Sequence, residues 1–253
     1  MRQELGWRDL YLFNLRLGPI NFVRSVDPMR CYEYPLVIEK LDCEGGLSIL
    51  DLGSGYNVLP AFVCFHTPKA SVHATDIDHA CASWQARYAN RLRHLFGIKG
   101  MVVVQQDCRM MAYAGEAFQR VCNVSSIEHV EGDDGDTRTM QEIARVLEPQ
   151  GLAVVVVPYS DRYREISWGG VFTRLYDQEA LFQRLIDPSG LVLREQLFWR
   201  VNVLGQLWYK LPWIVRLPFR WLMPMISPFM VRDAGMEDLH GAKGETCVVL
   251  RKE

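Results

Sequence analysis

Short apolar runs alternate with segments of helical periodicity through the middle of the chain. Five of these runs are rich in β-branched and aliphatic residues and lack polar alternation: 48–52, 71–76, 101–105, 119–124 and 152–157. Strands that helices cover on both faces have this composition. The runs therefore predict five buried strands of one sheet.

Two helices are predicted between these strands. The first has apolar side chains every three or four residues, namely Cys81, Trp84, Tyr88, Leu92 and Leu95. Asp78 is a suitable N-cap for it and Gly97 a suitable end. The second helix spans about 136–147. Strands and helices that alternate at this spacing form right-handed βαβ units, so the expected fold class is α/β with an open parallel sheet.

The remaining segments are expected to complete a single domain over residues 1–253. Residues 1–45 precede the first strand and predict a helical cover, in which Pro35 starts the helix that leads into the sheet. Two more strands are predicted after Gly190, and the second of them is the terminal strand. We divide the chain into a cover (1–45), a core (46–195), an insertion (196–240) and a terminal strand (241–253).

Composition and charge exclude several classes of protein. With 49% hydrophobic and 23% charged residues, the chain is neither disordered nor collagen-like. Its 28 basic and 30 acidic residues give a net charge of -2, which argues against a nucleic-acid partner. The seven cysteines form no C-x-x-C pair, so reduced thiols and a cytoplasmic location are expected. No run of 18 apolar residues predicts a membrane-spanning helix.

A glycine-rich turn follows the first strand. Gly53 and Gly55 lie before an apolar segment, where glycines let the backbone approach a ligand closely. A dinucleotide fingerprint requires a third glycine where this chain has Val58. The second strand ends at Asp76 and the third is followed by Asp107. Carboxylates at these two places suit ribose hydroxyls and an adenine amino group.

Four motifs in this order resemble the class I S-adenosylmethionine-dependent methyltransferases, in particular the ubiquinone- and menaquinone-biosynthesis group. They are ILDLGSG (49–55), ATDID (74–78), QQD (105–107) and RVLEPQGLAVVVVP (145–158). The resemblance implies a Rossmann-like, doubly wound sheet of seven strands in the order 3-2-1-4-5-7-6, with the last strand antiparallel. It also implies S-adenosyl-L-methionine as the cofactor. The chain departs from the family at Asn57 and Gln150, which stand where glycines are usual.

The resemblance assigns roles to residues of this chain. The glycine loop would wrap the methionine and ribose, Asp76 would bind ribose, and Asp107 with Cys108 would bind adenine. Ile77 would pack on the adenine, and Asp51 would hold the loop or the methionine amino group. The full set implied for cofactor binding is Asp51, Gly53, Ser54, Gly55, Asp76, Ile77, Asp107, Cys108 and Asn123.

The acceptor is expected at the ends of the fourth and fifth strands, where open α/β sheets bind ligands. His129 follows the fourth strand and is a candidate base; in the alternative, Glu128 and His129 only form local hydrogen bonds. Metal-binding members of the resembling family carry a Glu where this chain has Ser125, so no metal is expected. The acidic run 131–136 lacks the spacing of a calcium loop and is expected to complement a helix dipole.

Aromatic side chains are the candidates for the wall of an acceptor pocket. Tyr159, Tyr163 and Trp168 follow the fifth strand beside Gly169 and suggest a mobile wall or lid. Tyr159 is also a candidate for orienting or deprotonating an acceptor hydroxyl. Tyr34 is expected to close the other side of the pocket from the N-terminal cover.

The segment 196–232 contains five basic and no acidic residues, together with four of the seven tryptophans. Four prolines divide it into short pieces. Basic and aromatic residues on short amphipathic pieces are typical of a segment that lies on a membrane surface. Three interpretations stay open: a dock on an anionic membrane, an apolar lid over a hydrophobic substrate, and a dimer interface or plain core packing. The prolines and aliphatic bulk disfavour single-stranded nucleic acid.

The sequence thus predicts a cytoplasmic methyltransferase for a small-molecule or lipid-like acceptor, with association to a membrane surface as an open question. The first competing hypothesis is a non-catalytic protein of the same fold that binds a membrane or a partner. The second is a nicotinamide oxidoreductase, which Val58 and the antiparallel last strand disfavour. The acceptor atom and the oligomeric state are left open.

Overall fold

Eight strands form the central sheet of the computed structural model, which describes residues 6–18, 27–43, 45–168, 170–216, 219, 222–239 and 244–253. The strands are β1 (Ser48–Leu52), β2 (Ser71–Asp76), β3 (Met101–Gln105), β4 (Phe118–Val124), β5 (Leu147–Tyr159), β8 (Val192–Val201), β9 (Val231–Asp233) and β10 (Gly244–Arg251). All five predicted apolar runs coincide with β1 to β5.

The strands lie in the order β3-β2-β1-β4-β5-β10-β8-β9. β1 to β5 are mutually parallel, and β10 is antiparallel to both β5 and β8. This confirms the predicted order and the antiparallel last strand. The sheet has one strand more than predicted, because β9 pairs with the end of β8 through three residues. So short a strand leaves no periodic signal in the sequence.

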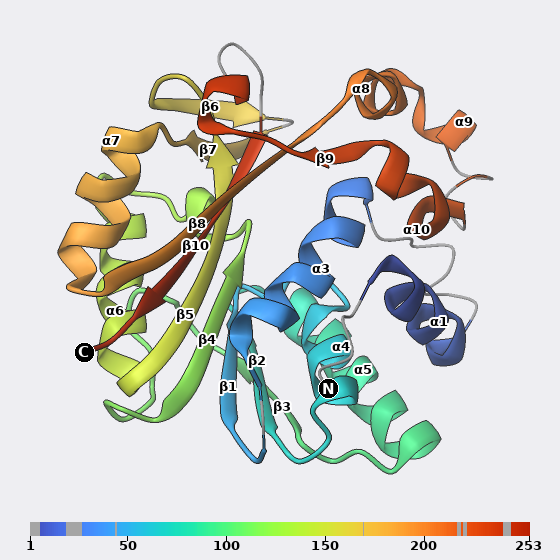
Figure 1. Ribbon diagram of the computed structural model, residues 1–253. Coiled ribbons are helices and arrows are strands. Elements are labelled where there is room, and N and C mark those ends of the chain that lie inside the picture. The colour runs from blue at the N-terminus through green and yellow to red at the C-terminus, as the bar shows by residue number, and fades with distance from the viewer. Residues whose placement is uncertain are drawn as a thin grey trace.

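Helices cover both faces of the sheet (Figure 1). α1 (Trp7–Leu17), α3 (Pro28–Leu41), α4 (Leu59–His66) and α5 (His79–Phe96) lie on one side. α6 (Gly135–Val146) and α7 (Gln178–Ala180) lie on the other, and α7 continues as a π-helical turn over Leu181–Ile186. Each face buries its own cluster of apolar side chains, as expected of a doubly wound sheet.

Local capping signals fix the ends of two helices. The Asp78 carboxylate caps α5, and Gly97 ends it with a φ of 70°, as predicted. The prediction that Pro35 starts a helix is wrong, because α3 begins at Pro28 and Pro35 lies inside it. Asp27 provides a cap oxygen and Pro28 presets the first turn, and together they form a stronger start than a proline alone.

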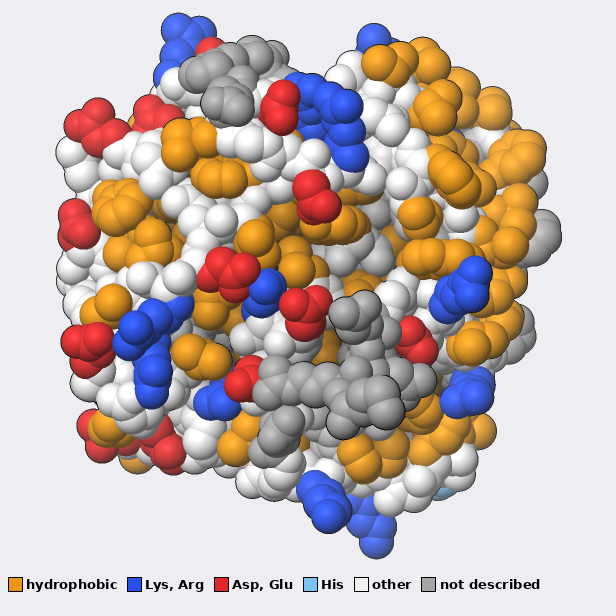
Figure 2. All heavy atoms as spheres, in the orientation of Figure 1, with side chains coloured by type: hydrophobic (Ala, Val, Ile, Leu, Met, Phe, Trp, Pro, Cys, Tyr) orange, Lys and Arg blue, Asp and Glu red, His pale blue; other side chains and the backbone are white. Residues whose placement is uncertain are grey.

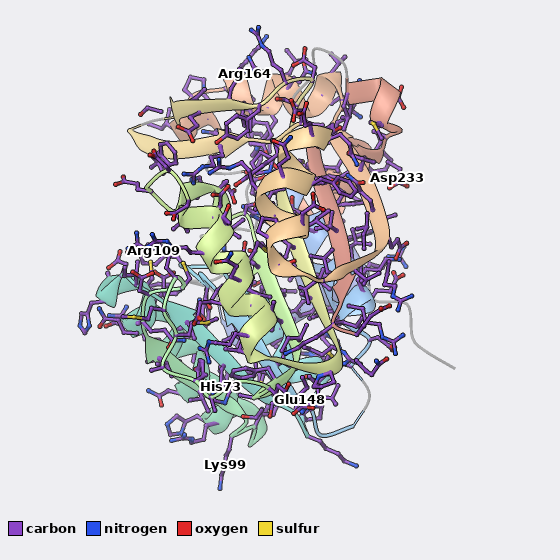
Figure 3. The ribbon with its side chains drawn as sticks, turned by 90° about the vertical axis from the view of Figure 1, so that its left-hand side faces the viewer. His73, Lys99, Arg109, Glu148, Arg164 and Asp233 are labelled. Atoms are coloured by element: carbon purple, nitrogen blue, oxygen red, sulfur yellow. The ribbon has the colours of Figure 1, made fainter. Side chains whose placement is uncertain are left out.

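A separate antiparallel hairpin, β6 (Arg164–Trp168) and β7 (Val171–Leu175), follows β5. The sequence predicted a mobile wall or lid here, whereas the structure shows two paired strands. Figure 3 places Arg164 at one end of the molecule and Lys99 and Glu148 at the other. The hairpin therefore stands beyond the carboxyl ends of the parallel strands.

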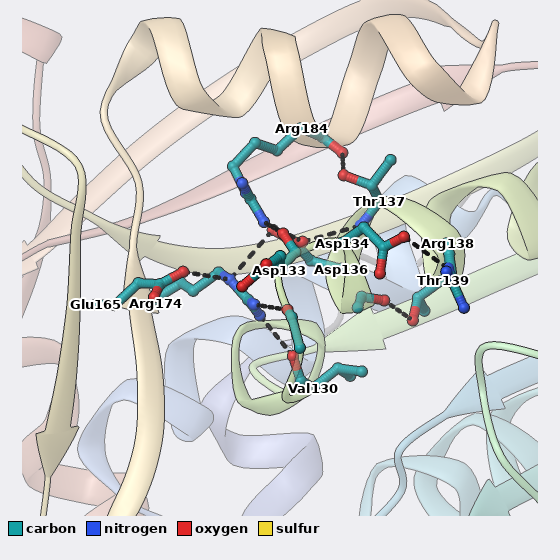
Figure 4. A network of polar contacts seen from close by, with 12 residues as sticks. Val130, Asp133, Asp134, Asp136, Thr137, Arg138, Thr139, Glu165, Arg174 and Arg184 are labelled. Atoms are coloured by element: carbon teal, nitrogen blue, oxygen red, sulfur yellow. Dashed lines mark hydrogen bonds and ion pairs between the residues drawn. The ribbon is translucent and has the colours of Figure 1, made fainter.

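A buried ion-pair network joins this hairpin to α6 (Figure 4). The fully buried Asp136 accepts two hydrogen bonds from Arg184, each of 2.8 Å, and one of 2.9 Å from the Tyr176 hydroxyl. The buried Arg174 of β7 lies 3.6 Å from the same carboxylate. Asp136 therefore does more than complement the helix dipole, which was the role predicted for the run 131–136, because it forms ion pairs with two arginines.

The segment between β8 and β10 is built from short pieces. β8 continues to Val201, so the segment that the sequence assigned to 196–240 begins as strand. α8 (Val203–Lys210), α9 (Trp213–Arg216) and α10 (Met223–Ile226) follow, and α10 packs against α1 and α3. In the part of the chain that the structure describes, no helix is long and apolar enough to cross a membrane.

We expect Asp136→Ala to destabilise the fold by about 3–5 kcal/mol, because it leaves Arg184 without its carboxylate partner and Arg174 with Glu165 alone. Urea unfolding followed by circular dichroism measures the change. Asp134→Ala is the matched control, since it removes an exposed carboxylate bonded to Arg138 and should cost at most about 1 kcal/mol. Similar losses in the two variants would contradict a central role for Asp136.

Candidate active site

A cleft of about 520 Å³ lies at the carboxyl edge of the sheet, beside the ends of β1 to β4. Open α/β sheets bind ligands at this edge, where the strand order changes direction. Six of the nine residues predicted for cofactor binding line the cleft: Gly53, Gly55, Asp76, Ile77, Asp107 and Cys108. Asp51, Ser54 and Asn123 lie behind this wall and are buried.

Gly53 brings the loop after β1 against the loop after β4. Its φ is +71°, and a Cβ at this position would lie 1.7 Å from Ser126 Oγ and 2.6 Å from Ser126 Cβ. Neither the backbone angle nor the space admits a side chain. The two loops that form the centre of the cleft are therefore in contact at Gly53.

Buried amides hold these loops in place. The Gln85 side chain of α5 donates to the carbonyl oxygens of Gly55 (2.9 Å) and Asn57 (2.8 Å). The Asn123 side chain donates to the Leu52 carbonyl oxygen (2.9 Å) and accepts from the Ile127 N–H (3.1 Å). Asn123 thus positions the loop from behind. The sequence reasoning missed Gln85, although a Gln in line with Cys81 and Tyr88 on the apolar face of a helix was a usable signal.

Asp76 faces the cleft at the end of β2. Its Oδ2 accepts a hydrogen bond from the Gly55 N–H (2.7 Å) and its Oδ1 accepts one from the Asp78 N–H (2.9 Å). A carboxylate has about four lone-pair sites, so both oxygens can accept a further hydrogen bond. These two bonds fix the carboxylate in an orientation that suits a pair of neighbouring hydroxyl groups.

Asp51 is a buried carboxyl group, only 3% exposed, at the foot of the glycine loop. Its Oδ1 accepts a bond from the Cys122 thiol (3.2 Å), while its Oδ2 has no hydrogen-bond partner among the described residues. Burial raises the pKa of Asp51 to about 6. An unpaired buried carboxyl oxygen is costly, and a ligand amino group would satisfy it. Ser54 supports this turn, since its N–H donates to the Thr75 carbonyl oxygen (2.9 Å).

The far end of the cleft is lined by Ile77, Asp107, Cys108 and Arg109. Ile77 is 61% exposed, which leaves an apolar side chain available to cover a flat ligand ring. The Arg109 guanidinium binds both oxygens of Asp107 and lowers the pKa of that carboxyl group. The sequence reasoning missed Arg109, whose place two residues after Asp107 was the available signal.

His129 lies on the β4 side of the cleft. Its Nδ1 is 2.8 Å from the carbonyl oxygen of Phe172 on β7, which can only accept, so Nδ1 carries the proton. In the neutral ring this leaves a lone pair on Nε2, which lies 3.6 Å from Glu128 Oε1. Glu128 is 1% exposed, and burial raises its pKa to about 8. The hairpin thus fixes the ring in the form that a general base requires.

Of the aromatic residues predicted for the acceptor pocket, Tyr34, Tyr159 and Tyr163 are not in the lining of this cleft. Tyr34 is 2% exposed and belongs to the core under α3. Tyr159 is also buried, and its ring packs edge-on against Phe198 at 5.0 Å. The Tyr163 hydroxyl donates to Glu165 within the hairpin region (2.7 Å). The side chain of Trp168 lies outside the described part of the structure.

Within the described ranges, no group of three or more His, Cys, Asp or Glu side chains is arranged to hold a metal ion. None of the seven cysteines, all of which lie in the described ranges, forms a disulfide.

Residues 50–155 match the protein family described as "Methyltransferase domain". This range begins in β1 and ends in β5, so it includes the glycine loop, Asp76, Asp107 and His129. A search of curated proteins gave no match to the chain.

Several solved structures share the fold. The geranyl diphosphate C-methyltransferase of Streptomyces coelicolor A3(2), in complex with Mg2+, geranyl diphosphate and S-adenosyl-L-homocysteine, aligns with a TM-score of 0.63 and 11% identity, covering 88% of this chain and 78% of that chain. A putative sarcosine dimethylglycine methyltransferase from Galdieria sulphuraria aligns with a TM-score of 0.59 and 18% identity, covering 88% and 83%. The [4+2]-cyclase SpnF aligns with a TM-score of 0.58 and 19% identity, covering 87% and 80%. At these identities the likeness shows the fold.

We expect Gly53→Ala to weaken the binding of S-adenosyl-L-homocysteine by at least about 100-fold, because the new Cβ displaces the loop at Ser126. Adding Ser126→Gly should restore most of the affinity, since both clashing atoms are removed and only the backbone strain of about 1–2 kcal/mol remains. Adding Ser126→Ala instead retains the 2.6 Å clash and should restore little. Isothermal calorimetry distinguishes the two double variants, and equal recovery in both would contradict the contact.

Proposed function

Residues 50–155 of this chain are a class I S-adenosylmethionine-dependent methyltransferase domain, and from this premise we propose that the protein methylates a small-molecule or lipid-like acceptor. The observation that carries the proposal is that Asp76 and the glycine loop line one cleft, with the unpaired Asp51 oxygen buried at the foot of that loop. These groups match the ribose hydroxyls and the amino group of S-adenosyl-L-methionine. They would bind it with Asp107, Cys108 and Ile77 around the adenine.

When bound, S-adenosyl-L-methionine supplies a methyl group already activated on a sulfonium. The protein therefore has to position an acceptor, exclude water and, for some acceptors, remove a proton. His129 is the candidate base, because its Nε2 lone pair is held in the cleft by the Phe172 carbonyl. Glu128 Oε1 lies 3.6 Å from this nitrogen. Tyr159 is the weaker candidate, since it is buried and lies outside the lining.

A non-catalytic protein of the same fold is the competing hypothesis. The [4+2]-cyclase among the structural neighbours shows that the fold is used for chemistry other than methyl transfer. Two observations favour methyl transfer here. The cofactor residues line one open cleft, and a histidine with a fixed tautomer lies on the side of the cleft next to β4.

We expect Asp76→Asn to weaken S-adenosyl-L-homocysteine binding by at least about 100-fold, because two hydrogen bonds to a charged acceptor are lost. Asp78→Asn is the matched control, since it removes a neighbouring charge and keeps a residue type that caps α5. Calorimetry measures both affinities. A thermal shift with NAD and none with S-adenosyl-L-homocysteine would overturn the proposed function.

An apolar surface covers α8, α9 and the neighbouring turns, where Figure 2 shows hydrophobic side chains gathered along one side of the molecule. Val203, Leu204 and Leu207 on α8 are 70%, 55% and 53% exposed. The wider set includes Leu211, Ile214, Val215, Phe219, Met225 and Phe229. Trp199 and Trp208 are instead buried, so core packing accounts for two of the tryptophans that the sequence assigned to a membrane dock.

We call these exposed apolar residues the α8 surface. We propose that the α8 surface binds the cytoplasmic face of an anionic membrane and so brings the enzyme to a lipid-like acceptor. A cluster of this many exposed apolar side chains on one side of a domain marks an interaction site. The exposed Lys210 and Arg232 flank it and favour anionic lipid headgroups. The exposed aliphatic side chains of α8 provide the apolar contact that an interfacial helix requires.

We expect the protein to sediment with anionic liposomes at low salt. The double variant Leu204→Glu and Leu207→Glu should bind at least about tenfold more weakly, because two leucines no longer enter the interface. Leu95→Glu, on the exposed surface of α5, is the matched control and should bind normally. Full recovery of the wild-type protein in the supernatant would remove the membrane proposal and leave the α8 surface to a lid or a dimer interface.

A further inference from the structure

A second group of polar side chains lies against the cleft, behind Ser125. Arg30 and Glu33 come from α3, Glu128 from the short turn after β4, and Glu245 from the start of β10. We call these four residues the acid cluster. Three separate elements of the fold therefore bring one arginine and three glutamates together.

Arg30 connects the acid cluster to the cleft. Its Nη1 donates to Ser125 Oγ at 2.7 Å and also to Glu33. Ser125 lines the cleft, and Glu128 is the neighbour of His129, which lines it as well. The acid cluster is thus bonded to the wall of the cofactor cleft.

The carboxyl groups of the acid cluster are buried and incompletely paired. Glu33 is 0% and Glu128 1% exposed. Glu33 Oε1, Glu128 Oε2 and Glu245 Oε2 have no hydrogen-bond partner among the described residues. The Trp199 indole favours the ionised form of Glu33, but its nitrogen does not reach hydrogen-bonding geometry with Oε1. Unpaired buried oxygens on three side chains indicate a missing hydrogen-bond donor.

The charges of the acid cluster do not balance either. Three carboxyl groups share one guanidinium, and the charges of Glu33 and Glu128 both act on Glu245. Burial raises the pKa of Glu128 to about 8 and raises the pKa values of Glu33 and Glu245. Other titratable groups interact electrostatically with members of the acid cluster or lie beside them. They are Asp27, Cys31, Tyr34, His129, Tyr176, Tyr209 and Cys247.

The acid cluster also lies on the side of the cleft that the cofactor residues leave free. The six cofactor residues that line the cleft lie at or after the ends of β1, β2 and β3, whereas Glu128 follows β4. Because β10 is antiparallel to β5, Glu245 pairs with Pro158 near the carboxyl end of β5. The ends of β4 and β5 are where an acceptor has to approach the cofactor.

We propose that the acid cluster recognises the methyl acceptor, and that the acceptor carries a cationic nitrogen group, an amine or alkylammonium, which binds to Glu33, Glu128 and Glu245. This inference rests on the proposed methyl transfer. An alkylammonium brings one positive charge, which reduces the excess of carboxyl groups over guanidinium, and three N–H donors, which match the three unpaired oxygens. An anion is disfavoured, because Arg30 already binds Glu33.

The test uses n-butylammonium as a probe, with n-butanol and butyrate as its neutral and anionic counterparts, on protein saturated with S-adenosyl-L-homocysteine. We expect butylammonium alone to bind in calorimetry. Its affinity should rise as the pH approaches 8, since burial raises the pKa of Glu128 to about 8 and the cation requires this carboxyl group to be ionised. In buffers of different ionisation enthalpy, binding should release protons. Equal binding of butanol, preferred binding of butyrate, or no binding of butylammonium would each overturn the inference.

Variants locate the binding. Glu128→Gln and Glu245→Gln should each weaken butylammonium binding by at least about tenfold, and Glu128→Gln should also reduce the rise with pH. Glu179→Gln is the matched control, because it removes an exposed carboxylate on α7 and should leave binding unchanged. An equal loss in Glu179→Gln would assign the effect to overall charge and overturn the inference.

The outcomes also separate this inference from the proposed function. If the protein binds S-adenosyl-L-homocysteine but not butylammonium, the proposed methyl transfer stands and the cationic acceptor is excluded. Protein that binds neither S-adenosyl-L-homocysteine nor the amine loses both. If it binds only the amine, and Glu128 and Glu245 are required, the acid cluster is a cation site but the proposed methyl transfer is excluded.

Discussion

The contact between Gly53 and Ser126 is the constraint on which the site depends. It closes the loop after β1 onto the loop after β4, so the positions of Asp51, Asp76 and His129 are all set relative to one point. Gln85 and Asn123 hold the two loops from behind through amide hydrogen bonds. The cleft is therefore shaped before a ligand enters, and little conformational entropy remains to be lost on binding.

Local signals made much of the fold predictable. Apolar runs without alternation identified β1 to β5, and Asp78 and Gly97 fixed the ends of α5, because strands buried on both faces and helix caps depend on neighbouring residues. The resemblance to class I methyltransferases supplied the strand order, which no local pattern contains. Six of the residues assigned to the cofactor line one cleft because they follow strands whose carboxyl ends share an edge.

The remainder depends on contacts between distant residues. From the sequence alone, Asp136 is indistinguishable from a surface acid. Its burial depends on contacts with Arg174 and Arg184, which are more than thirty residues away in the chain. In the same way Glu33, Glu128 and Glu245 are ordinary charged residues in the sequence, and their burial appears only when three elements meet. For Tyr34 and Tyr159 the difference is the reverse. Their aromatic rings suggested an accessible pocket wall, but the direction of their side chains on α3 and β5 places them in the core. Burial of polar groups is a property of packing that residue type does not encode.

β10 lies between β5 and β8, although both of these strands precede it in the chain. During synthesis on the ribosome, β5 and β8 therefore leave the exit tunnel before residues 244–251. Until then, the strand edges that will pair with β10 have unpaired backbone groups. Open strand edges are sites of mispairing with other chains. The nascent protein has a period of exposure to aggregation that ends with insertion of β10, and a molecular chaperone that shields β8 in this interval would raise the yield of folded protein.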